Sequence, residues 1–275
     1  MLMHPMLEQL KSLKLSGMVE VLNEQLQDKT IRELSFEERL GFMVERESTL
    51  RENKKLNRRL SKANLKFTQA AIADIDYRAE RKLDKHLIAT LATGDWIKTH
   101  SNFLITGATG TGKSWLSNAL AHKACLLGYS AKYWRVSNLL EELALSKADG
   151  RYSKLIKALA KVDLLILDDW AMVKLQQGHQ QGMFDLLDDR YQQKSTLVLS
   201  QVPVDHWYEQ IANSTFADAI IDRMLSDSYR LELKGPSLRA GRQVQNITQD
   251  ERSINDAQGE HSTNNTNETK GGEIK

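Results

Sequence analysis

Apolar residues recur at helical spacing in the first part of the chain. Between residues 6 and 60 they fall three or four positions apart, as at Leu7, Leu10 and Leu13. This period predicts amphipathic helices that bury one face. We expect a small all-helical module here, whose first helix is interrupted at Ser16-Gly17.

From about Ile88 the apolar residues instead form short continuous runs separated by helical patterns. This alternation predicts a parallel sheet with helices on both faces. After Arg242, Asn, Thr, Glu, Gly and Gln dominate, and so few apolar side chains cannot offset the entropy of ordering. The expected strands are residues 103–106, 131–136, 163–167, 196–200 and 229–233.

These patterns divide the chain into three parts. We predict a helical N-terminal domain over residues 1–75, an α/β domain over 76–243 and a disordered polar tail over 244–275. The length of 275 residues and a hydrophobic content of 41% suit a globular protein. A single cysteine, Cys125, excludes an internal disulfide, and no secretory signal or membrane-length apolar run is evident. We therefore expect a cytoplasmic protein.

A glycine-rich motif follows the first expected strand. The segment Gly107-Ala-Thr-Gly-Thr-Gly-Lys-Ser114 matches G-x-x-x-x-G-K-[ST], and a helical pattern begins at Lys113. In such a P-loop the backbone amides surround phosphate oxygens, Lys113 neutralises the β- and γ-phosphates, and Ser114 ligates Mg²⁺. We predict ATP and Mg²⁺ as cofactors. The expected nucleotide contacts are Gly107, Ala108, Thr109, Gly110, Thr111, Gly112, Lys113, Ser114 and Trp115.

Two carboxylates end the expected strand over residues 163–167. Asp168 at the carboxyl end of the sheet is placed to hold magnesium, the role of a Walker-B aspartate, and Asp169 is placed to orient the attacking water. Alone, the pair could be a solvated turn. With the P-loop upstream and residues 131–136 between as another strand, the pattern favours ATP hydrolysis.

Further segments make the chain resemble the IstB family, the helper ATPases of insertion-sequence transposition within the DnaC-like AAA+ group. The likeness covers about residues 7–242. It is carried by Leu10-Lys-Ser-Leu-Lys-Leu-Ser-Gly-Met18, Ser195-Thr-Leu-Val-Leu-Ser-Gln-Val-Pro-Val-Asp-His-Trp207, Asp218-Ala-Ile-Ile-Asp-Arg-Met224 and Leu233-Lys-Gly-Pro-Ser-Leu-Arg239.

The resemblance implies roles for several polar residues. Ser200 and Gln201 match the sensor-1 position, which contacts the γ-phosphate and the attacking water, and Arg223 matches an arginine finger that enters a neighbouring subunit's ATP site. Ser237 and Arg239 match a closing S-x-R element of undefined role. Without the resemblance, Arg223 reads as a surface side chain and Ser200-Gln201 as an ordinary end of a strand.

The resemblance also sets the expected fold class. This is an α/β AAA+ P-loop core with a five-stranded parallel sheet, preceded by a small all-α domain and without a C-terminal helical lid, because the residues after Arg242 are too polar. Most AAA+ enzymes carry Glu after the Walker-B aspartate. Asp169 is one methylene shorter, so we expect weaker water activation and slow turnover.

Basic residues concentrate between residues 51 and 66, where Glu52 is the single acid. On one helix they would occupy neighbouring rows of one face. Runs of charge are usually solvated faces, but the one-sided sign favours contacts to DNA phosphates that do not depend on sequence. The candidate DNA-contacting residues are Arg51, Lys54, Lys55, Arg58, Arg59, Lys62 and Lys66.

These features together predict an ATP-dependent transposition helper. It would form a homo-oligomer with ATP sites shared between subunits, assemble on duplex DNA, deform it and present it to a partner transposase, with hydrolysis driving release. The alternative is a helicase loader resembling DnaC or DnaI. A small-molecule kinase is a third interpretation, disfavoured because no lid or acceptor pocket is evident.

Overall fold

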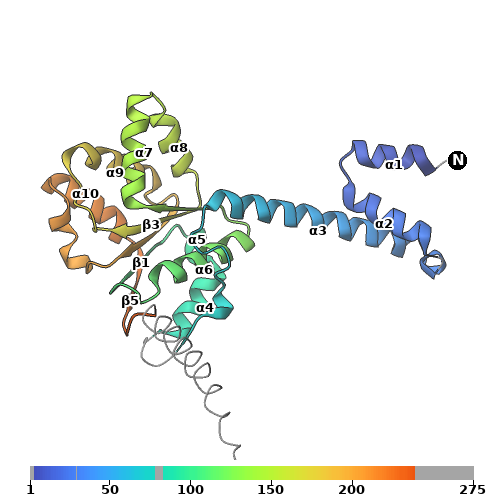
Figure 1. The fold of residues 1–275 in the computed structure, drawn as a ribbon, viewed down its shortest axis with the longest axis horizontal. Coiled ribbons are helices and arrows are strands. Elements are labelled where there is room, and N and C mark those ends of the chain that lie inside the picture. Colours follow the sequence, from blue (N-terminus) through green and yellow to red (C-terminus); the bar gives the residue numbers. More distant parts are fainter. Residues whose placement is uncertain (1–2, 29, 78–82, 239–275) are drawn as a thin grey trace, which may run out of the picture.

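A computed structural model describes residues 3–28, 30–77 and 83–238. It consists of an α/β body from which one long helix projects, with a small helical module at the far end of that helix (Figure 1). The candidate tail over residues 244–275 and Arg239 lie outside the described residues.

The body contains a five-stranded sheet in the order β2-β3-β4-β1-β5, and every neighbouring pair is parallel. All five expected strands are confirmed. The third continues through both aspartates to Trp170 because a register shift after Leu167 lets it pair again with β4. The strands are β1 (Asn102–Gly107), β2 (Ala131–Arg135), β3 (Leu164–Trp170), β4 (Ser195–Ser200) and β5 (Ser228–Leu233).

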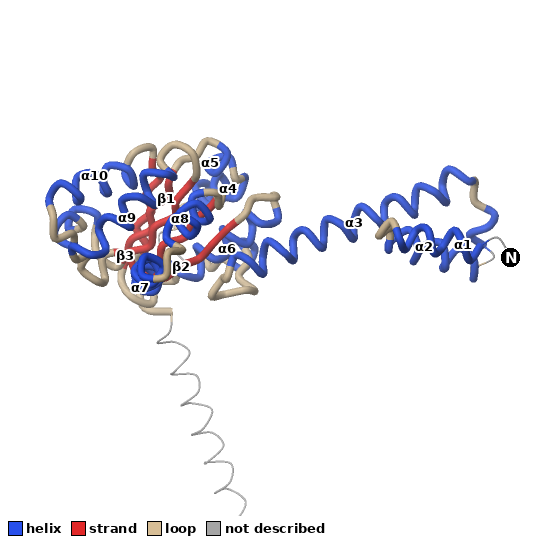
Figure 2. Tube along the Cα trace, turned by 90° about the horizontal axis from the view of Figure 1, so that it is seen from above, coloured by secondary structure: helices blue, strands red, loops and turns tan. Residues whose placement is uncertain are grey.

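Helices cover both faces of the sheet (Figure 2), as expected for strands buried on both sides. Alternating side chains of each strand enter two separate cores, so that Phe103 and Ile105 face one and Leu104 the other. The first face carries α4 (Lys85–Thr93), α5 (Asp95–Lys98) and α6 (Lys113–Leu126), and the second carries α7 (Val136–Ala148), α8 (Tyr152–Ala160), α9 (Gln177–Arg190) and α10 (Ser214–Leu225).

The N-terminal module is helical, as predicted. Its elements are α1 (Met3–Ser12), α2 (Ser16–Gln27), a short 3-10 helix η1 (Thr30–Glu33) and α3 (Phe36–Ala63). The expected break at Ser16-Gly17 is wrong. The chain turns at residues 13–15, and Ser16 begins the second helix.

Helix α2 lies unusually close to α3 at Gly17. A Cβ on this glycine would lie 2.7 Å from the Cα of Glu47, a backbone atom that no rotamer change can move. The buried Glu47 carboxylate accepts a hydrogen bond of 2.8 Å from the Gly17 amide and one of 2.6 Å from Arg51 Nε. Glu47 thus satisfies an amide in the first turn of α2 that has no partner within the helix.

Helix α3 belongs to both the module and the body. Leu56, Leu60, Ala63 and Leu65 join the core that also contains the first face of the sheet. The helix ends at Asn64, whose φ of 53° is left-handed, so the prediction that Lys66 continues the helical rows of bases is wrong. The domain boundary at residue 75 stays a prediction.

Candidate nucleotide site

The predicted P-loop connects β1 to α6. Gly107, Gly110 and Gly112 have φ values of 144°, 80° and 91°, a left-handed region that side chains other than glycine rarely adopt. The turn therefore depends on the glycines of the motif. It delivers Lys113 to the first position of α6, so the helix N-terminus, with its partial positive charge, is part of the loop.

Lys113 lies folded against this loop. Its side chain is buried, and its ammonium donates hydrogen bonds of 2.6 Å to the Gly107 carbonyl and 2.9 Å to the Ala108 carbonyl. The positive charge is thus held within the phosphate-binding turn. Thr111 donates from its hydroxyl to the same Ala108 carbonyl at 2.9 Å, whereas Trp115 packs against the core of the first sheet face.

The two Walker-B candidates differ in exposure and conformation. Asp168 is 2% exposed, and its Oδ1 accepts a hydrogen bond of 2.8 Å from the Asp169 amide. Asp169 has a φ of 61°, which is uncommon for a residue other than glycine and is often found at functional sites. Its side chain is one-third exposed and therefore reaches the surface at the edge of the sheet.

Strand β2 adds two residues that the sequence analysis did not identify. The Tyr133 hydroxyl donates a 2.5 Å hydrogen bond to Asp168 Oδ2. Arg135, two residues further along β2, forms an ion pair of 3.1 Å with Asp169. Strand alternation places both on one face of β2, but the pairing of β2 with β3 had to be known before these contacts could be inferred.

The sensor-1 candidates lie beside the P-loop because β4 pairs with β1, with Thr106 opposite Ser200. The Ser200 hydroxyl is buried and used internally: it donates to the Trp170 carbonyl at 2.8 Å and accepts from the Val202 amide at 3.0 Å. Gln201 instead lines a groove of about 640 Å³ that also touches Gly107. Because Gln201 lines this groove and the Ser200 hydroxyl is buried, Gln201 is better placed than Ser200 for a phosphate contact.

The segment after β5 returns to the P-loop. Leu238 donates from its amide to the Gly110 carbonyl at 3.0 Å. A Cβ on Gly110 would lie 2.7 Å from Ser237 Cβ. This contact makes Ser237, the first residue of the predicted S-x-R element, part of the wall around the phosphate loop.

Arg223, the candidate arginine finger, is held by its own chain. It lies in the last turn of α10, and its guanidinium donates to Asp188 on α9 through Nε at 2.7 Å and Nη2 at 2.6 Å. The same group lies over the rings of Phe184 at 4.7 Å and Tyr191 at 5.8 Å. In the structure the guanidinium is therefore engaged within its own subunit.

The basic candidates on α3 differ in exposure, and three of them have partners, of which Arg51 is paired with Glu47 at 2.6 Å. Arg59 lies against the body, where Nη1 donates to the Cys125 carbonyl at 3.4 Å, and Lys54 donates to the Ser16 hydroxyl at 3.2 Å. Arg51, Lys55, Arg58 and Lys62 follow i, i+4, i+7 and i+11 spacing and are all exposed. These four residues form a solvent-facing row along α3, which we call the basic stripe.

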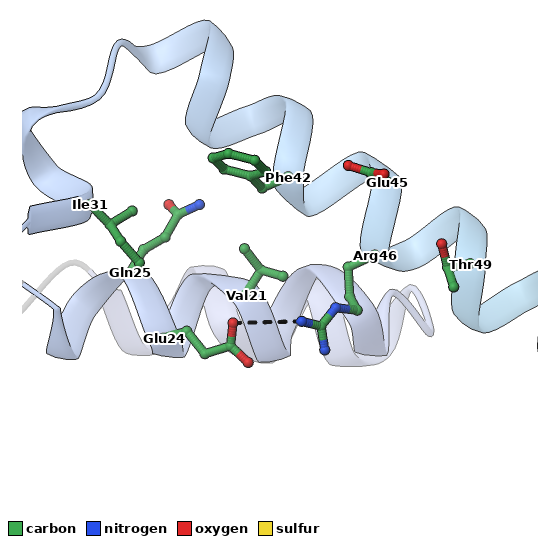
Figure 3. A pocket seen from close by; sticks show the side chains of 8 residues that line it. All are labelled: Val21, Glu24, Gln25, Ile31, Phe42, Glu45, Arg46 and Thr49. Carbon is green, nitrogen blue, oxygen red and sulfur yellow. Dashed lines mark ion pairs between the residues drawn. The ribbon is translucent and has the colours of Figure 1, made fainter.

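A second cavity, of about 360 Å³, lies between α2 and α3 at the far end of the long helix. Figure 3 shows its wall, in which Phe42 faces Val21 and Ile31 while an ion pair of 3.9 Å joins Arg46 to Glu24. Residues 16–50 carry eight acidic and four basic side chains. The surroundings of this cavity therefore do not suit a phosphate ligand.

Comparison with known proteins decides the family. The profile of the IstB-like ATP binding proteins matches residues 8–246. The chain belongs to this family. A putative insertion-sequence ATP-binding protein of Sinorhizobium fredii is 45% identical over 239 residues, covering 87% of this chain and 97% of that protein. The putative ATP-binding protein of IS1162 from Pseudomonas fluorescens is 45% identical over 197 residues, covering 72% and 85%.

Solved structures agree on the fold. The crystal structure of DnaI aligns with a TM-score of 0.51 at 20% identity, covering 62% of this chain and 90% of that one. The DnaC helicase loader aligns with a TM-score of 0.50 at 14% identity, covering 60% and 97%. Family and fold together confirm the prediction of an ATP-binding AAA+ ATPase. No helix among the described residues is long and apolar enough to cross a membrane.

Proposed function

We propose that this IstB-like ATPase is a transposition helper that assembles on duplex DNA in its ATP-bound state and presents that DNA to a transposase. The insertion-sequence origin of its relatives supports this context. The observation that carries the DNA-binding part is the basic stripe, which lies on a helix that is rooted in the core of the ATPase body. Sequence-independent contacts to phosphates are the expected result.

The residues at the sheet edge suit a magnesium nucleotide. Ser114 supplies a hydroxyl and Asp168 a carboxylate, both oxygen donors of the kind that Mg²⁺ prefers. Each Asp168 oxygen accepts one hydrogen bond in the structure, which leaves further lone pairs for a metal or its water. When bound, the ion would neutralise charge on the phosphates, while Asp169 orients the attacking water.

The candidate arginine finger, Arg223, is the basis for the proposed oligomerisation. Arg223 lies in the last turn of α10, and in a homo-oligomer it would complete a neighbour's ATP site. Arg223 would then stabilise the transition-state charge on the phosphates only in the assembly. ATP therefore favours the assembled state, and hydrolysis favours dissociation. The Asp188 ion pair would hold the arginine in the separate subunit. A cytoplasmic location stays a prediction.

DNA binding in the presence of a slowly hydrolysed ATP analogue tests this function. We expect tighter binding to a duplex of about 50 base pairs than to the single strand, and a steep loss of affinity as salt rises. Reversing Arg58 and Lys62 to glutamate should weaken duplex binding by tenfold or more and reduce the salt slope by about two, because each phosphate contact contributes about one.

Two exposed lysines, Lys157 on α8 and Lys161 directly after this helix, give a matched control. Their reversal to glutamate changes the net charge by the same amount on another surface. Equal losses in the two double variants would refute the basic stripe as the contact. Preference for single strands together with binding to a replicative helicase would instead support a helicase loader.

A further inference from the structure

The Tyr133 hydroxyl on β2 reaches the carboxylate of Asp168. The strands pair with Tyr133 opposite Ile166, so Asp168 lies two positions further along β3, on the same face of the sheet. That face is covered by α6, the helix that begins at the P-loop. The tyrosine ring belongs to this core, whereas its hydroxyl points to the functional edge.

The Asp168 carboxylate is fixed from two directions. Oδ2 accepts from the Tyr133 hydroxyl at 2.5 Å and Oδ1 accepts from the Asp169 amide at 2.8 Å. The two donors approach different oxygens, so together they restrict rotation of the carboxylate about its last torsion.

The Tyr133 hydroxyl donates this hydrogen bond from a largely buried position. Burial raises the pKa of this phenol far above its ordinary value, and the hydrogen bond to the Asp168 carboxylate raises the pKa further. The side chain is only 7% exposed, so water does not readily replace the aspartate as its partner. The contact therefore persists while Asp168 is ionised.

We propose that Tyr133 is a positioning residue for the metal-binding aspartate, holding the Asp168 carboxylate in the orientation that faces a magnesium nucleotide. This inference rests on the proposed role of Asp168. Residues that orient a ligand of a metal commonly change metal affinity by about 10- to 100-fold when they are removed. Tyr133 extends the site from β3 to β2.

The alternative is that the hydroxyl only satisfies a buried carboxylate. The chain offers a matched control for this alternative, because Tyr152 on α8 donates an identical 2.5 Å hydrogen bond to Asp185 on α9. The pKa of Tyr152 is likewise raised by burial and by its aspartate. Tyr152 packs with the helices of the second sheet face, whereas Tyr133 lies in the core of the first.

The test measures the magnesium dependence of nucleotide binding in the full-length protein. A fluorescent ATP analogue is bound at a fixed concentration and Mg²⁺ is titrated, and binding is also measured in EDTA. Tyr133→Phe should raise the Mg²⁺ concentration at half-maximal binding by about tenfold or more, and change the affinity in EDTA by less than about threefold. Tyr152→Phe should change neither quantity.

Asp168→Asn separates failure of this inference from failure of the proposed function. The positioning role is refuted if Asp168→Asn shifts the Mg²⁺ midpoint while Tyr133→Phe and Tyr152→Phe show the same midpoint. If Asp168→Asn does not shift the midpoint, Asp168 is not the metal-binding aspartate and the inference fails with it. Tyr133→Phe should lower the melting temperature at least as much as Tyr152→Phe, because its hydrogen bond to the carboxylate is the more buried of the two.

Discussion

Replacing Gly17 by alanine should loosen the N-terminal module, although alanine is the better helix former. The added Cβ would lie 2.7 Å from Glu47 Cα and 2.8 Å from Glu47 N. Both are backbone atoms of α3, so α2 must move away, at about 1–3 kcal/mol for overpacking. This movement also weakens the 2.8 Å hydrogen bond from the Gly17 amide to the Glu47 carboxylate, worth about 1.5–3 kcal/mol.

Against these costs stands a gain of about 1 kcal/mol from helix propensity. The net result is a module that opens more easily by about 1.5–5 kcal/mol. Gly41 provides the control, because it lies within α3 and a Cβ there meets nothing within 4 Å. Gly41→Ala should therefore stabilise the helix by about 1 kcal/mol.

Amide hydrogen exchange over residues 16–27 measures the loosening of α2 where it arises. Gly17→Ala should accelerate exchange in α2, and Gly41→Ala should leave it unchanged or slow it. The reasoning fails if the two alanines change the exchange rate in the same direction. Nucleotide binding should be unaffected in either variant, because the module lies at the far end of α3 from the P-loop (Figure 1).

Three other perturbations test the body of the protein. Arg223→Ala should retain nucleotide binding but lower the hydrolysis rate of the assembled protein by roughly 10³-fold. Asp188→Asn should hydrolyse ATP at least as fast as wild type. A fully active Arg223→Ala would refute the role of Arg223 as an arginine finger. Gly110→Ala should lower the melting temperature more than Gly150→Ala, because both have left-handed φ but only Gly110 contacts another segment; equal shifts would contradict that contact. Although burial opposes it, hydrogen bonds from Lys194 and Ser130 lower the pKa of Asp163. The stability that Asp163 contributes is therefore complete above its unfolded pKa of about 3.9 and is lost as pH falls through the lower folded value. In urea unfolding, Asp163→Asn should be less stable than wild type at pH 7 and equally stable in acid, and a difference that does not change with pH would contradict this.

The sequence predicts the sheet well because its central strands β1, β3 and β4 are largely apolar runs buried on both faces, whereas the edge strands β2 and β5 alternate between buried and more exposed residues. Helix ends are less certain, since they depend on local backbone conformation. Asn64 ends α3 in a left-handed conformation and so removes Lys66 from the helix, and the turn at residues 13–15 precedes the Ser-Gly pair that seemed to mark it. Neither change alters a buried apolar position, so the hydrophobic pattern does not report it.

The phosphate loop is predictable because its whole mechanism lies in consecutive residues. The contacts of Tyr133 with Asp168, and of Arg223 with Asp188, join residues 35 positions apart in the sequence. Each depends on which elements become neighbours, and the motifs do not contain this information. The return of residues 237–238 to Gly110 is of the same kind, because it follows from the pairing of β5 with β1.

Binding of ATP to Lys113→Ala tests the nucleotide site most directly. Equilibrium binding of labelled ATP with Mg²⁺ should be lost in this variant, together with phosphate release. Binding should be retained in Lys123→Ala, in which the lysine lies on the same helix outside the loop. Wild-type affinity in Lys113→Ala, or an equal loss in both variants, would contradict a triphosphate site built on the Gly107–Ser114 loop.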